Sequence, residues 1–558
     1  MDFRRKSVPF ACGQLTLSTA GDRQGTKLII LETMEDKCRM NNKCLRFISA
    51  LADVGVICVG GIILIIGAVL FFGSMLGTAD LGLDEVITFG RDNIFLNILW
   101  LILCCAFGIG LMMLMKKKEL YMRISSKQLY TAVGIITFIV GVLWILQSLS
   151  SPTNDSRITT EAGIKLANGD YSPIGTVYFK RFPFQLGYVF WTEICSRLLF
   201  LPDKTWGLVL QVVNIICLAF ANVALVRISE RLFKNKAVTF ATAVMLILFS
   251  QAVIFSSFMY GTIPGFAFAV WAVYNFIAYI QDKKIKNLVL ASILVTVAVW
   301  IKLNNLIFAV AMIIILVVHF LRGEYLKRFL SVCLMALIVF GAKNLPVIQY
   351  ELRTGNDFGD GIPMVCWLSM GLGDSVFAPG WYDSRDTVAL FDGPEDADYA
   401  SNTAKERIKE RIEFFKENPD KAYTFFKDKT YSQWNEPTFS SIWNNKVRGQ
   451  YAPKVGYAKL VCGEGEEFTK NVMDINVQFL YFGFMISSVF MIFDKFKKKG
   501  IKDEFILIPT VIIGGFLYHL LFEAKSQYVL PYVVIMIPYC VWGTYRLTVY
   551  IRNLIKSR

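Results

Sequence analysis

The stretch "TAVGIITFIVGVLWILQSLS", residues 131–150, decides the fold class. It contains no charged residue, and an α-helix of about 20 residues spans the roughly 30 Å hydrocarbon core of a bilayer. Comparable apolar runs recur between residues 52 and 547. The sequence therefore predicts an α-helical polytopic membrane protein.

Composition supports this fold class. Of the 558 residues, 55% are hydrophobic and 18% are charged, and the mean hydropathy is +0.48. A soluble domain carries about 25% charged residues. The formal net charge of +14 could suggest nucleic acid binding, but the basic residues concentrate in short segments between apolar runs, such as 116–127, 227–236 and 494–504. Such segments are typical of cytoplasmic loops, so no nucleic acid partner is expected.

One topology satisfies all the basic clusters, because two apolar runs separate each cluster from the next. It has about twelve crossings of the cell membrane and places both termini in the cytoplasm. The crossings fall near residues 52–74, 93–115, 128–149, 205–226, 237–259, 262–280, 287–304, 306–320, 329–350, 475–493, 505–522 and 527–546. The predicted units are a cytoplasmic tail (1–47), an extra transmembrane hairpin (48–127), a membrane core (128–351), an extracytoplasmic domain (352–474) and C-terminal transmembrane helices (475–558).

Two long segments then lie outside the cell. Segment 150–204 contains an apolar run, 182–201, which includes Glu193 and Arg197. Counting this run as a crossing would invert every later basic cluster, so we expect an amphipathic helix in the outer interface with its charges on one face. Segment 352–474 is too long for a structureless loop and predicts a small mixed domain.

Sequence motifs for metal and nucleotide sites are lacking. No Cys/His ligand spacing, P-loop or GxGxxG motif occurs, which disfavours a zinc enzyme and an ATP-driven pump. No cofactor is expected; a divalent metal stays possible but has no support in the sequence. Among the 12 cysteines, Cys366 and Cys462 fall in the large outer segment, and whether they form a disulfide is left open.

Carboxylates follow the opening stretch directly, in "SPTNDSRITTEAG" at residues 151–163. Asp155 could act as a base or could cap the helix that the following residues predict. Glu161 could support it, although a solvated helix face is the simpler interpretation. Asp170, in "NGDYS", marks a turn.

Four stretches carry a resemblance to a known family. They are "GDYS" followed by "YFKRFPFQLGYVFW", "CWLSMGLGDSVFAPGWYDSRD", "FFKDKTYSQWNEPTF" and "FEAKSQYVLPY". In this order they resemble bacterial GT-C membrane glycosyltransferases of the family 39 and protein mannosyltransferase group, of the Gram-positive type, over residues 128–546. The resemblance implies a GT-C-like fold, a polyprenyl-phosphate sugar donor and an inverting transfer. It also implies that Asp155 is the catalytic base, with Glu161 second.

Cations near the outer helix ends are candidates for the donor phosphate. Lys525 is the first, although relatives often carry an arginine where this chain has Gln527, and Lys525 could instead snorkel to the headgroups. The other candidates are Lys180, Arg181, Lys302 and Lys343. Candidate sugar or acceptor contacts are Tyr528, Trp381, Tyr382, Trp434 and Asn435, with core packing as the more frequent role for the two tryptophans. Asp84 and Glu85 are interpreted as a solvated loop.

These observations predict a glycosyltransferase whose active site lies outside the cell. Its partners would be a polyprenyl-phosphate sugar, an envelope glycan or lipid acceptor, and the membrane lipids. Two alternatives remain. A transporter or flippase of lipid-linked saccharides suits twelve crossings, but such folds are usually built from repeats, and none is visible here. A polymerase or ligase would differ in using a lipid-pyrophosphate donor.

Overall fold

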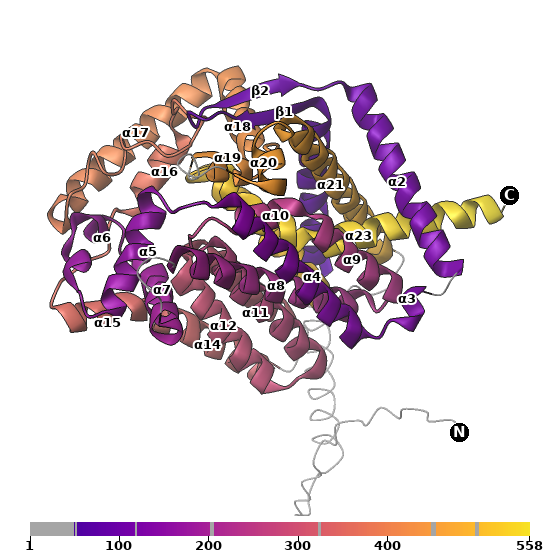
Figure 1. Cartoon of the computed structure of the whole chain (residues 1–558), viewed down its shortest axis with the longest axis horizontal. Coiled ribbons are helices and arrows are strands. Elements are labelled where there is room, and N and C mark those ends of the chain that lie inside the picture. Colours follow the sequence, from indigo (N-terminus) through magenta and orange to yellow (C-terminus); the bar gives the residue numbers. More distant parts are fainter. Residues whose placement is uncertain are drawn as a thin grey trace, which may run out of the picture.

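The protein is a helical bundle with folded segments at one end, as the computed structural model shows (Figure 1). The structure describes residues 50, 53–117, 120–200, 206–321, 325–447, 454–496 and 502–557. The predicted cytoplasmic tail, residues 1–47, lies outside the described residues.

Apolar helices occur at every predicted crossing. In the described part of the chain, nine helices are long and apolar enough to span a membrane, and three shorter apolar helices accompany them. They are Asp53–Leu76, α2 (Ile94–Lys117), α4 (Ser126–Ser148), α8 (Trp206–Phe233), α9 (Lys236–Leu248) continued by α10 (Ser250–Phe255), α11 (Thr262–Asp282), α12 (Ile285–Ile301), α13 (Leu306–Phe320), α14 (Tyr325–Ala342) continued by α15 (Leu345–Thr354), α21 (Glu466–Phe496), α22 (Leu507–Leu521) and α23 (Ser526–Lys556). This confirms the polytopic membrane fold.

The remaining elements are short and lie mostly between the crossings. They are β1 (Gly77–Leu81), β2 (Ile87–Arg91), α3 (Leu120–Arg123), α5 (Asn154–Ala167), η1 (Ser172–Gly175), α6 (Val177–Arg181), η2 (Pro183–Gln185), α7 (Leu186–Leu199), η3 (Leu303–Asn305), α16 (Met364–Leu372), η4 (Pro394–Asp396), α17 (Ala397–Glu417), α18 (Pro419–Trp434), α19 (Ser441–Val447), α20 (Gly456–Cys462) and η5 (Asp503–Ile506). Strands β1 and β2 pair antiparallel, with Gly77 opposite Arg91. In Figure 1, α5–α7 and α15–α17 gather on one side of the molecule, away from α2.

Two helices, α11 and α23, form the centre of the bundle. In their apolar windows 78% and 72% of the residues are buried, compared with 28% in α4. A helix that is apolar all round is stable only when other helices or lipid surround it. The outer helices therefore present apolar side chains to lipid, whereas α11 and α23 present theirs to protein.

The predicted crossing 237–259 is two helices rather than one. The chain leaves helical geometry at Phe249, which separates α9 from α10. Gln251 follows the break, is completely buried, and donates hydrogen bonds to the carbonyl oxygens of Pro437 (3.2 Å) and Met473 (3.4 Å). Because a buried amide needs partners, the break lets Gln251 bind backbone from segment 352–474 and from α21.

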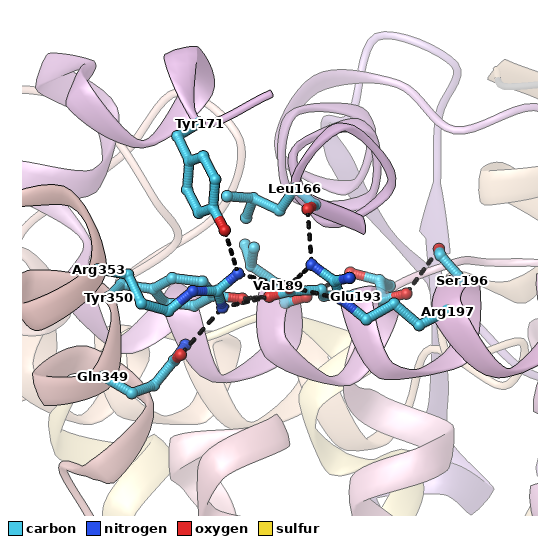
Figure 2. Close-up of polar contacts among 10 residues, drawn as sticks. Leu166, Tyr171, Val189, Glu193, Ser196, Arg197, Gln349, Tyr350 and Arg353 are labelled. Atoms are coloured by element: carbon cyan, nitrogen blue, oxygen red, sulfur yellow. Dashed lines mark hydrogen bonds and ion pairs between the residues drawn. The ribbon is translucent and has the colours of Figure 1, made fainter. Parts of the chain in front are cut away.

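The segment predicted to be an interfacial amphipathic helix forms α7, but its acid does not face the membrane surface. Glu193 is only 3% exposed and lies between α7 and α15 (Figure 2). It accepts hydrogen bonds from Arg197 (2.9 and 3.0 Å), Arg353 (2.8 and 3.0 Å) and the Tyr350 hydroxyl (2.6 Å). The expectation of a charged exposed face is therefore wrong for Glu193, because two arginines compensate its burial.

Segment 352–474 is built from helices and turns in its described residues, rather than from a mixture of helices and strands. Its helices α17 and α18 meet at Asn418, within "ENPDK" at residues 417–421. An isolated bridge joins Trp381 to Ala524 in the loop before α23. Cys366 and Cys462 are both free and lie in different hydrophobic clusters, so they form no disulfide.

Candidate functional site

Asp155 lies in the first turn of α5, directly beyond the end of α4. Thr153 is the residue that caps this helix, and its backbone N–H donates to the Ser156 hydroxyl (3.2 Å). The interpretation of Asp155 as the helix cap is therefore wrong. The Asp155 side chain is exposed, so it is accessible to a substrate.

The opposite end of α5 is held by the Glu193 network. Arg197 donates to the carbonyl oxygen of Leu166 (3.0 Å), and Arg353 donates to the Tyr171 hydroxyl (2.9 Å), so one buried acid organises α5, α7 and α15 (Figure 2). Burial raises the pKa of Glu193, but the hydrogen bonds from Arg353, Tyr350 and Arg197 outweigh it and hold that pKa below its usual value of 4.5. This network fixes the helix that carries Asp155.

Side chains from distant segments lie within electrostatic reach of Asp155. Burial raises the pKa of Tyr178, and the carboxylate of Asp155 raises it further. Burial also raises the pKa of Tyr382, with Glu523 and Asp155 adding to that effect. The charge of Lys302, in turn, interacts with the charges of both Glu523 and Asp155. The fold thus brings together groups from α5, α6, the α12–α13 turn, segment 352–474 and the α22–α23 loop.

Lys302 is the cation at the centre of this group. It lies in the turn between α12 and η3, with its ammonium nitrogen 3.9 Å from the Tyr260 ring centroid and 5.5 Å from that of Tyr528. The turn is held close to α7, because a Cβ on Gly187 would lie 1.7 Å from the Trp300 carbonyl oxygen. Aromatic faces stabilise a cation without neutralising it. Lys302 therefore stays available to an anionic substrate.

Glu523 is the second acid of the site and was not among the residues predicted from the sequence. It accepts a hydrogen bond from the Tyr528 hydroxyl (2.8 Å). Burial raises the pKa of Glu523, while the hydrogen bond from Tyr528 and the charges of Lys302 and Lys525 lower it. The signal was present in "FEAKSQYVLPY", where this acid stands two residues before Lys525 at the end of a crossing.

Lys429 was also missed. Its ammonium group is completely buried and donates to the carbonyl oxygens of Gly371 and Phe522 (2.8 Å for Phe522). Burial lowers the pKa of Lys429 to about 7, and the charge of Glu523 opposes that shift. Lys429 thereby ties α16 and α18 to the loop that carries Glu523.

Other predicted acids have structural partners instead. Glu161 forms an exposed ion pair with Arg157 (2.7 Å) on α5. Asp170 accepts a hydrogen bond from the Ser172 backbone N–H (3.0 Å), and hydrogen bonds from Ser172 lower its pKa. Glu161 therefore lies on a solvated helix face, and Asp170 stabilises a turn, as the simpler interpretation of each predicted.

The predicted phosphate-binding cations do not all gather at the site. Lys525 forms an ion pair with Glu85 and lies 5.2 Å from the ring centroid of Trp443. The interpretation of Glu85 as part of a solvated loop is therefore wrong, because it is the ionic partner of Lys525. Arg181 donates to the Phe391 carbonyl oxygen (2.9 Å) and pairs with Asp392, which connects α6 to segment 352–474.

Lys180 and Lys343 stay outside the described interactions of the site. Lys180 is half-buried on α6, whereas Lys343 is exposed between α14 and α15. Among the five predicted cations, Lys302 acts electrostatically with both Asp155 and Glu523.

The predicted sugar-stacking residues divide into two groups. Trp381 and Trp434 are each 1% exposed, and the Trp381 indole donates to Ser432 (3.0 Å), so they pack the core. Asn435 is also 1% exposed and donates to the Gly77 carbonyl oxygen (3.4 Å). Tyr382 and Tyr528 are partly exposed and lie near the acids of the site, so they are accessible to a substrate.

The described residues contain no group of three or more His, Cys, Asp or Glu side chains suited to a metal ion. What the site offers is an exposed carboxylate, a half-buried carboxylate, a lysine that interacts electrostatically with both of them, and several tyrosines. Chemically, this set can accept a proton and can hold a substrate that carries an anionic group.

A model of a known protein family matches part of this bundle. Residues 189–344 match the family model described as dolichyl-phosphate-mannose-protein mannosyltransferase. The match begins within α7 and ends just after α14, so it includes Lys302 and Lys343 but neither Asp155 nor Glu523. No curated protein matches the chain. The matched segment supports a GT-C-like membrane glycosyltransferase that uses a lipid-linked sugar.

Proposed function

We propose that this protein transfers a sugar from a polyprenyl-phosphate donor to a cell-envelope glycan or lipid acceptor on the outer face of the membrane. The observation that carries the proposal is the convergence of Asp155, Lys302 and Glu523 at one end of a bundle whose middle third resembles a lipid-linked mannosyltransferase family. Asp155 reaches this end from α5, Lys302 from the α12–α13 turn, and Glu523 from the α22–α23 loop.

The reaction proposed is a single inverting displacement. The carboxylate of Asp155 takes the proton of the acceptor hydroxyl, whose oxygen attacks the anomeric carbon of the donor sugar. The bond between that carbon and the phosphate oxygen breaks, and the lipid phosphate leaves with the bonding electrons. No covalent enzyme intermediate is required in an inverting transfer.

Lys302 is proposed to meet the donor phosphate. Phosphate carries more negative charge once it has left than while it is esterified to the sugar, so a fixed cation favours the transition state over the bound donor. The Tyr260 and Tyr528 rings hold the lysine in place. Glu523 accepts a hydrogen bond from the Tyr528 hydroxyl and is proposed to orient that tyrosine. It is also proposed to interact electrostatically with Lys302 in the free enzyme.

The direct test incubates the purified protein with polyprenyl-phosphate sugars and an envelope acceptor fraction, and measures the polyprenyl phosphate released. Release that depends on both the donor and the acceptor supports the proposal. Turnover with a lipid-pyrophosphate saccharide alone would assign the protein to the polymerases or ligases instead. Movement of lipid-linked saccharide across vesicles without bond cleavage would assign it to the flippases.

A matched pair of variants tests the role of the lysine. Lys302→Met should reduce kcat by about 10²-fold or more, as expected for losing a preorganised charge at a developing anion. Lys343→Met removes a lysine from an exposed position in the same matched segment and should leave kcat unchanged. Equal losses in the two variants would contradict the assignment of Lys302.

A further inference from the structure

A cavity lies at the end of the bundle opposite Asp155. It has a volume of about 750 Å³ and is lined by residues of α4, α8, α11, α13 and η5. Its α4 residue, Tyr130, is near the beginning of that helix, whereas Asp155 follows the end of the same helix. The two sites therefore face opposite membrane surfaces, and the proposed transfer reaction makes no use of this one.

Every carboxylate in the lining already has a partner. Asp282 pairs with Arg231 (3.2 Å), and Asp503 pairs with His319 (2.9 Å). Glu230 accepts hydrogen bonds from the hydroxyls of Ser126 and Tyr130, and Glu504 accepts one from the Gln281 amide (3.2 Å). The acidic groups are thus occupied by groups of the protein itself.

Three cations of the lining have no acidic partner in the described residues. They are Arg227, Lys234 and Lys502. Lys234 and Lys502 are exposed at the mouth of the cavity, whereas Arg227 lies deeper on α8. Six residues separate Arg227 from the end of α8 at Phe233, which corresponds to a depth of about 9 Å along the helix axis.

Among these three cations, Arg227 has a buried N–H group without a hydrogen-bond acceptor. Its guanidinium carbon lies 4.8 Å from the ring centroid of Tyr130, 5.4 Å from that of Trp271 and 5.9 Å from that of Tyr274. Its Nε atom is buried and has no hydrogen-bond acceptor. Ring faces stabilise the charge but do not replace the acceptors that five N–H groups require. An arginine at membrane depth without an acid is costly unless a function maintains it.

We infer that this cavity binds a phosphate ester, with Arg227 as its central contact and Lys234 and Lys502 at its entrance. The guanidinium fork matches phosphate oxygens in a way that an ammonium group cannot. The shared chemistry is the phosphate group, which either a lipid headgroup of that leaflet or a soluble phosphate ester can supply.

The test measures binding to the purified full-length protein by native mass spectrometry, with dioleoyl phosphatidic acid, dioleoyl phosphatidylglycerol and dioleoylglycerol as probes. The two phosphate lipids should bind at least about tenfold more tightly than dioleoylglycerol, since a charge-assisted hydrogen bond contributes about that factor. Glycerol phosphate is the third arm. If glycerol phosphate displaces the phosphate lipids at a concentration similar to theirs, the ligand is a soluble phosphate ester. If it does not displace them, the ligand is a lipid, and phosphate is recognised in both cases.

Variants connect the binding to the cavity. Arg227→Gln should weaken phosphate-lipid binding by about tenfold or more, and Arg227→Lys should weaken it less. Lys286→Gln is the matched control, because Lys286 is exposed in the first turn of α12 at the same end of the bundle and does not line the cavity. The double variant Lys234→Gln/Lys502→Gln tests the exposed entrance if Arg227 variants fail to fold. Equal binding of dioleoylglycerol, or equal losses in the cavity and control variants, would overturn the inference.

Discussion

Replacing Glu193 by glutamine removes the negative charge from a carboxylate that three side chains share. The structure gives the carboxylate five hydrogen bonds of 2.6–3.0 Å, from Arg197, Arg353 and Tyr350. Glutamine keeps the shape of the side chain but offers one oxygen in place of two. Its NH₂ group would then face donors rather than acceptors.

The cost follows from burial. Removing one partner of a buried ion pair costs about 3–5 kcal/mol, because the remaining charge loses its compensation. Arg197 and Arg353 are 49% and 29% exposed, so water restores part of their solvation and favours the lower end, about 3 kcal/mol. For a chain larger than 150–250 residues we expect a decrease in Tm of roughly 3–6 °C.

The assay is thermal unfolding of detergent-purified protein, followed by tryptophan fluorescence. Glu161→Gln is the matched control, since Glu161 also pairs with an arginine four residues away but is 38% exposed. An exposed pair of this kind contributes about 0.3–0.5 kcal/mol, so its Tm should hardly change. Equal decreases for Glu193→Gln and Glu161→Gln would refute the interpretation of Glu193 as a buried organising charge.

Acid provides a second check on the same residue. Because the folded-state pKa of Glu193 is held below the usual 4.5, its stabilising contribution is fully present above pH 4.5 and is lost as the pH falls through the folded-state pKa. The difference in Tm between the wild type and Glu193→Gln should therefore shrink below pH 4.5. A difference that stays constant in acid would contradict the assigned ionisation.

Three further predictions follow from other contacts. Gly163→Ala should cost about 1–3 kcal/mol in unfolding free energy, because its Cβ would lie 2.1 Å from a Thr192 oxygen, whereas Gly134→Ala, with its nearest contact at 3.4 Å, should be tolerated. The Tm of the wild type should rise from about pH 7 upward, because the pKa of Lys429 is about 7 in the folded protein and its usual 10.5 in the unfolded chain, so the unfolded chain binds more protons there. Lys429→Met removes this group and should abolish the rise. A thermal-unfolding double-mutant cycle of Glu85→Gln and Lys525→Gln should show about 0.5 kcal/mol or more of coupling, and additive effects would contradict their ion pair.

The crossings could be predicted from the sequence because their signal is local. A run of about 20 apolar residues specifies a transmembrane helix whatever it packs against. The division of α17 from α18 was equally local, since Pro419 cannot continue the preceding helix. The break between α9 and α10 was not predicted, because it depends on backbone acceptors that Pro437 and Met473 supply from far along the chain.

The site was only partly predictable for the same reason. Asp155 and Lys302 could be selected individually, as charges beside predicted helix ends. Glu523 lies near Asp155 and Lys302 because of how α5, α12 and α22 pack together. Spacing along the chain carries no information about this packing. The same limit explains why Glu193 was expected on an exposed face, since Arg353 lies 160 residues away.

The measurement that tests the central claim most directly is the turnover of Asp155→Asn with a polyprenyl-phosphate sugar and its acceptor. Loss of the general base should reduce kcat by about 10²–10⁴-fold, with little change in the affinity for the donor. Asp170→Asn, which changes another exposed acid of segment 150–204, should keep wild-type turnover. Wild-type turnover by a folded Asp155→Asn protein would contradict the account.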